Sequence, residues 1–116
     1  MDIVVTVPKR FGLRRWIEEG DPAGSQWSGQ LWTFSCGGHR PNIAIGERVY
    51  IVCEGCLRGY APLVRLEWNG NWGSFVRGGD AVAVTIPNPI VGFRGWRYRW
   101  WDKESEHPFL RWKEVA

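Results

Sequence analysis

Turn-forming residues divide this chain into short segments, and that division limits the folds open to it. The 116 residues include 15 glycines and seven prolines, which favour turns and interrupt helices. Between them lie short runs rich in β-branched and aromatic residues, which predict strands. The clearest runs are residues 2–7, 30–35, 47–53 and 57–67. The Glu54-Gly55 step between the last two runs predicts a hairpin.

Two later segments also predict strands. Residues 80–86 alternate alanine and valine, which favours a buried central strand. Residues 92–101 are aromatic and, if extended, place Trp96 and Trp100 on one face and Arg97 and Arg99 on the other. The cationic face is either the solvent side of a core strand or a phosphate-binding surface.

A single segment predicts a helix, because residues 10–19 carry their apolar side chains roughly on one side before Gly20. Many short strands with one early helix favour a mostly β (α+β) fold with one or two helices, built as a small mixed β-barrel. The length suits one domain over residues 1–116.

Hydropathy and cysteine content predict a location. No run approaches the roughly 18 apolar residues of a membrane span, and Asp2 stands where a signal peptide would be basic. Three cysteines cannot all pair, which favours reduced thiols. We therefore expect a cytoplasmic protein without a membrane partner.

The cysteines also allow a metal site. Cys36 and His39, then Cys53 and Cys56 thirteen residues later, have the spacing of a zinc ribbon. Each pair is equally consistent with an ordinary hairpin turn. Zinc is therefore an open alternative, and no other cofactor is expected.

The cations are unusual in kind rather than in number. The net charge is +3, but twelve of the fifteen basic residues are arginine, which stacks on aromatic rings and binds phosphates in a bidentate manner. Nine tryptophans accompany them. Trp16, Trp96 and Trp100 are expected in the core, whereas Trp27 lies in a loop and is expected in a binding cleft. The positions of Trp68, Trp72 and Trp101 stay open.

The segment 45–52 (IGERVYIV), followed by 57–63 (LRGYAPL), resembles the central hairpin of the PUA-like superfamily, whose ASCH and EVE members carry a similar run. The order of elements is similar over residues 2–86. The resemblance implies a PUA-like barrel that recognises nucleic acid or a modified nucleotide. It also implies a cleft beside the first helix and this hairpin.

The ASCH signature G-x-K-x-x-E-x-R aligns with residues 7–14. Lys9 and Arg14 match it, but Val7 replaces its glycine and Gly12 replaces its glutamate. In catalytic relatives, the resemblance implies a cluster containing this lysine and an acid, so the catalytic set is incomplete here.

The sequence therefore favours a binding module for RNA or DNA over an enzyme. One alternative is a small hydrolase or ribonuclease with Lys9 as acid–base group and Arg14 as anion clamp. The other is a zinc-ribbon-like interaction protein. Oligomeric state is left open. The predicted ligand-binding residues are Lys9, Arg14, Trp27, Arg58, Tyr60, Arg97 and Arg99.

Overall fold

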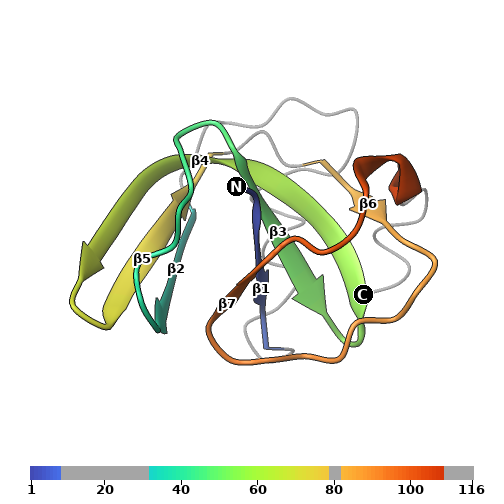
Figure 1. The fold of residues 1–116 in the computed structure, drawn as a ribbon. Helices are drawn as coiled ribbons and strands as arrows, with labels where there is room; N and C mark the ends of the chain where they lie inside the picture. The colour runs from blue at the N-terminus through green and yellow to red at the C-terminus, as the bar shows by residue number, and fades with distance from the viewer. Residues whose placement is uncertain (9–31, 79–81, 109–116) are drawn as a thin grey trace.

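The protein is built around one curled β-sheet, seen in a computed structural model that describes residues 1–8, 32–78 and 82–108 (Figure 1). Its six strands lie in the order β2-β5-β4-β3-β1-β7. All neighbours pair antiparallel except β1 and β3, which are parallel. The bounds are β1 Ile3–Thr6, β2 Trp32–Gly37, β3 Arg48–Cys53, β4 Cys56–Asn69, β5 Trp72–Arg77 and β7 Trp96–Tyr98.

A smaller sheet and one short helix complete the described chain. β6 (Val84–Thr85) pairs with β8 (His107–Pro108), and a 3₁₀ helix, η2, spans Lys103–Ser105. Within the described ranges, no helix is long and apolar enough to cross a membrane.

The long strand β4 curls the sheet. Its first half pairs with β3 and its second half with β5, so it appears in Figure 1 as an arc joining the two halves. The register shifts in each half, at Arg58 and again between Leu63 and Arg65. Because an extra residue in one strand bends and twists it, these irregularities close the sheet into a half-barrel.

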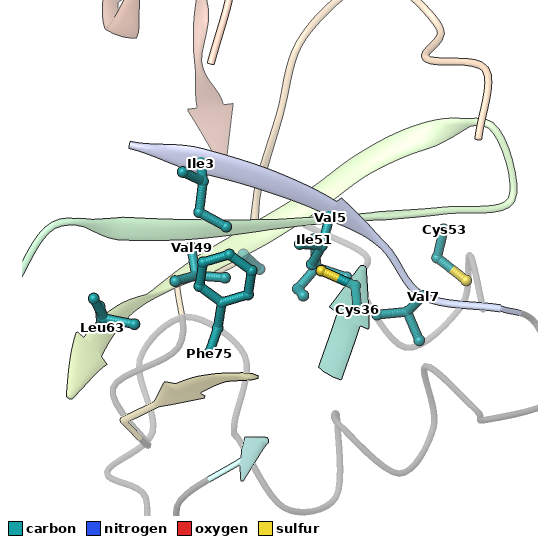
Figure 2. Close-up of a cluster of buried hydrophobic side chains, with 10 residues drawn as sticks. Ile3, Val5, Val7, Cys36, Val49, Ile51, Cys53, Leu63 and Phe75 are labelled. Carbon is teal, nitrogen blue, oxygen red and sulfur yellow. The ribbon is translucent and has the colours of Figure 1, made fainter. Parts of the chain in front are cut away.

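The central strands β1 and β3 are buried on both faces. Alternate side chains enter two clusters, one inside the curl and one on its outer face. Figure 2 shows the inner cluster, where Phe75 of β5 and Cys36 of β2 point toward Val49 and Ile51 of β3. The outer cluster consists of Val4, Tyr50, Val52, Leu57, Ile86, Ile90 and Trp101.

Two indole N–H groups hold the loop after β2 in place by hydrogen bonds. Trp68 Nε1 donates to the Gly38 carbonyl at 3.1 Å, and Trp96 Nε1 donates to the next carbonyl, of His39, at 3.0 Å. Trp68 belongs to β4 and Trp96 to β7, so the loop is tied to both halves of the sheet. Both rings pack on the inner cluster.

The mostly β fold is confirmed, and so is the hairpin, where Glu54 (φ 52°) and Gly55 (φ 80°) adopt positive φ. The predicted helix at 10–19 lies outside the described residues. The prediction of a central strand at 80–86 is wrong, because β6 has only two residues and belongs to the small sheet. The aromatic strand predicted at 92–101 is shortened to β7, because Gly95 turns the chain at φ 75°.

Candidate nucleic-acid interface

A segment that runs from the end of β6 through β7, residues 86–101, carries aromatic side chains onto the outer face of the sheet. Ile86 and Ile90 anchor it in the outer cluster. The Ile90 amide donates to the Gly55 carbonyl at 2.9 Å, and the Phe93 amide donates to Thr6 Oγ1 at 3.2 Å. The segment is therefore fixed to the hairpin turn at one point and to the end of β1 at another.

The segment presents what we term the aromatic–arginine surface, formed by Phe93, Arg97 and Trp100. Arg97 Cζ lies 4.3 Å from the centroid of the Phe93 ring, in cation–π geometry. The Phe93 and Trp100 centroids are 6.2 Å apart at an interplanar angle of 65°. Arg97 is exposed, and Trp100 is 52% exposed. Exposed Arg94 follows Phe93 in the chain.

Buried Trp101 lies beneath this surface and connects it to the sheet. Its ring meets Trp100 at 5.0 Å and Tyr50 at 5.1 Å, both edge-on. The Trp100 side chain therefore lies against a ring that is itself packed on β3.

Glu106 holds Trp101 in place. Its carboxylate accepts hydrogen bonds from Tyr50 Oη at 2.6 Å, Trp101 Nε1 at 2.9 Å and Arg48 Nη1 at 3.0 Å. The Glu106 side chain is only 7% exposed. Burial, together with this hydrogen bond to Glu106, raises the pKa of Tyr50 above its usual value, so the phenol stays a donor at neutral pH.

A second carboxylate, Asp2, fixes the start of β1. Burial alone would raise its pKa, but hydrogen bonds from the Arg48 amide at 2.8 Å and from Arg99 Nε at 3.2 Å outweigh burial. Lys103 Nζ, 3.6 Å away, acts in the same direction, so the pKa of Asp2 is lowered. Arg99 also donates to the Trp101 carbonyl. The Arg99 guanidinium therefore makes contacts within the fold. It does not lie on an exposed cationic face, as the sequence predicted.

Of the other predicted ligand-binding residues, Arg58 is not at the surface. It is 2% exposed, its Nε donates to the Cys53 carbonyl at 3.1 Å, and its Nη2 lies 3.6 Å from Glu54 Oε2. An arginine at a bulge that folds back onto its own hairpin turn stabilises the turn and cannot reach a surface ligand.

Tyr60 is half-buried under the Arg48 guanidinium, whose Cζ is 4.0 Å from its ring centroid, and it packs against Tyr50 at 5.3 Å. Lys9, Arg14 and Trp27 lie outside the described residues. Of the four predicted residues that the structure describes, only Arg97 belongs to an exposed aromatic surface. The hydrolase alternative, which depends on Lys9 and Arg14, stays a prediction.

The proposed zinc ligands do not converge. Among residues 1–8, 32–78 and 82–108, which include all four, no three His, Cys, Asp or Glu side chains are grouped to hold a metal. Cys36 and Cys53 are buried in the inner cluster, and burial raises the pKa of the Cys36 thiol. His39 is exposed and lies edge-on to Trp96 at 5.2 Å. Cys53 and Cys56 flank the β3–β4 hairpin turn, as the alternative interpretation predicted. Cys36 and His39 span the end of β2 and a bend, and β2 pairs with β5, so this pair is not a hairpin turn.

Sequence reasoning missed three residues of this region. Phe93 and Glu106 were not assigned to a site, and Trp100 was expected in the core. Gly92 and Gly95 could have indicated that residues 92–101 do not form one continuous strand, because glycine weakens a strand and favours a bend.

The comparisons with known proteins add no relative. No family model matches the chain, and searches of curated proteins and of solved structures find no similar protein.

Proposed function

We propose that this protein is a nucleic-acid-binding module of PUA-like fold, acting in the cytoplasm on nucleic acid or a modified nucleotide. The observation that carries the proposal is the aromatic–arginine surface, where exposed Arg97 lies over Phe93 beside exposed Trp100. The curled six-stranded sheet and the β3–β4 hairpin support the PUA-like assignment. The odd number of cysteines supports the location.

The chemistry of the surface suits this ligand. A half-exposed indole offers a flat face to a base, and stacking of a base on an aromatic ring is worth about 1–3 kcal/mol. An arginine beside the ring supplies a charged donor for phosphate oxygens. Since Trp100 and Arg97 belong to one short segment pinned to the sheet, both are held ready before a ligand arrives.

The test is a fluorescence-anisotropy titration of labelled oligonucleotides of about eight nucleotides, at roughly 50 mM salt. We expect Trp100→Leu and Arg97→Ala each to weaken binding, the former by about 5- to 150-fold, the value of one lost stack. Trp72→Leu is the matched control, because Trp72 is 59% exposed but lies on β5, apart from the outer-face segment. Arg65→Ala is the control for charge, since Arg65 is exposed and pairs with Glu67.

Both controls are expected to bind within about twofold of the parent protein, because surface changes outside an interface contribute little. If no RNA or DNA oligonucleotide binds at low salt, the proposed function is wrong. If all four variants bind alike, the ligand site lies elsewhere on the protein.

A further inference from the structure

We infer that the aromatic–arginine surface takes an unpaired base of a single strand and discriminates against duplex. This inference rests on the proposed function and names the ligand class of the same surface. It depends on how Trp100 is held, on the cost of exposing a base, and on the charge of the surrounding segment.

The first step is the geometry of Trp100. Among the described residues, two aromatic rings contact it at steep angles, Phe93 at 65° and Trp101 at 85°. Neither ring stacks in parallel on the indole, and 52% of the residue is exposed. A flat ring of the ligand can therefore stack where these two neighbours do not.

The affinity gained by stacking a base on Trp100 must exceed the cost of exposing that base. One stack on an aromatic side chain strengthens binding by about 5- to 150-fold. A base in a duplex already has both faces stacked, and releasing it costs a factor of the same order or larger. One indole cannot offset that cost, whereas a single strand presents its bases with little penalty.

The third step is charge. Duplex binders typically neutralise about 6–10 phosphates, but the described segment 82–108 carries its basic residues close to acidic ones. Arg99 and Lys103 are engaged with Asp2, and the exposed acids Asp102 and Glu104 follow Trp101. Within residues 82–108, exposed Arg97 of this surface and the neighbouring exposed Arg94 can supply about two phosphate contacts.

The experiment compares three probes of one sequence: the single strand, the same strand with abasic sites in its centre, and the duplex. We expect the single strand to bind at least about tenfold tighter than either of the others. The slope of log K against log salt is expected near −1.4, the value of about two single-strand phosphate contacts. Trp100→Phe should retain most of the preference that Trp100→Leu removes, and circular dichroism checks that both variants are folded.

The outcomes separate the two proposals. If the duplex or the abasic strand binds as tightly as the intact single strand, this inference is overturned while nucleic-acid binding stands. If none of the three probes binds, the proposed function fails as well. A Trp100→Phe variant that binds like Trp100→Leu also overturns the inference, because a phenyl ring still stacks on a base.

Discussion

Replacing Glu106 with alanine is expected to destabilise the fold strongly, although the residue stands in a short polar stretch near the end of the described chain. Its carboxylate accepts from Tyr50, Trp101 and Arg48 at 2.6, 2.9 and 3.0 Å. The substitution removes the acceptor that all three side chains share. Two of the donors, on Tyr50 and Trp101, belong to buried residues of the outer cluster.

The magnitude follows from these donors. A buried donor left without an acceptor costs about 1–3 kcal/mol, and the Tyr50 hydroxyl and the Trp101 indole contribute one such loss each. The Arg48 side chain is 29% exposed, so water solvates it and its ion pair adds at most about 1 kcal/mol. We therefore expect Glu106→Ala to lower the free energy of unfolding by about 2–7 kcal/mol. Glu106→Gln, which retains an acceptor oxygen, should cost roughly 1–2 kcal/mol.

Urea unfolding followed by tryptophan fluorescence measures the change. With a slope of about 1–3 kcal/mol per molar urea, the unfolding midpoint of the alanine variant should fall by at least about 0.7 M. Glu104→Ala is the matched control, since Glu104 is an exposed acid of the short helix η2, which ends just before Glu106, and should change stability by less than about 0.5 kcal/mol. Equal effects of the two alanine substitutions would refute the buried network.

Three other perturbations follow from the structure. Gly73→Ala would place a Cβ against the Trp68 ring, so we expect a loss of about 1–3 kcal/mol in a thermal melt; an unchanged melting temperature contradicts this packing. Gly38→Ala, at φ +119° with Trp96 Nε1 3.4 Å from the new Cβ, should cost about 1–2 kcal/mol, and a neutral result would contradict the fastened loop. Asp2 has a folded pKa below its ordinary 3.8, so its stabilisation is full above about pH 5 and is lost as the pH falls through 3.8 toward the folded pKa. Urea unfolding at neutral and at acidic pH measures this effect: Asp2→Asn should lose less stability between the two pH values than the parent protein does. If both proteins lose the same stability, the lowered pKa of Asp2 is refuted.

Local pattern predicted the central part of the fold well. β1 and β3 are β-branched runs with few competing structures, and the turn at Glu54-Gly55 follows from two residues that tolerate positive φ. These features depend on neighbours in sequence, so the sequence alone suffices for them.

The structure of residues 92–101 was harder to predict, because it depends on where the pairing of β7 with β1 ends. Period-two alternation correctly separates Trp96 and Tyr98, which pack on the inner cluster, from exposed Arg97. β7 ends at Tyr98, however, and beyond it alternation no longer applies. Trp100 is therefore exposed and Trp101 buried, the reverse of the assignment expected for Trp100.

The polar residues were least predictable, because their roles are set by distant partners. Glu106 is buried by Tyr50, 56 positions away in the chain, and Arg99 is held by Asp2, 97 positions away. A single sequence shows that such residues are present, but it does not show which of them come into contact. The same limit applies to Arg58, whose burial follows from a bulge that pattern alone does not locate.

The most direct test of the central claim is to locate a bound base on the protein. A single-stranded oligonucleotide carrying a photoreactive pyrimidine is cross-linked to the full chain, and the modified residues are mapped by mass spectrometry. The account predicts cross-links at Trp100 or Phe93, and their loss in Trp100→Leu. Cross-links confined to the β4–β5 hairpin around Trp72, unaffected by that substitution, would contradict it.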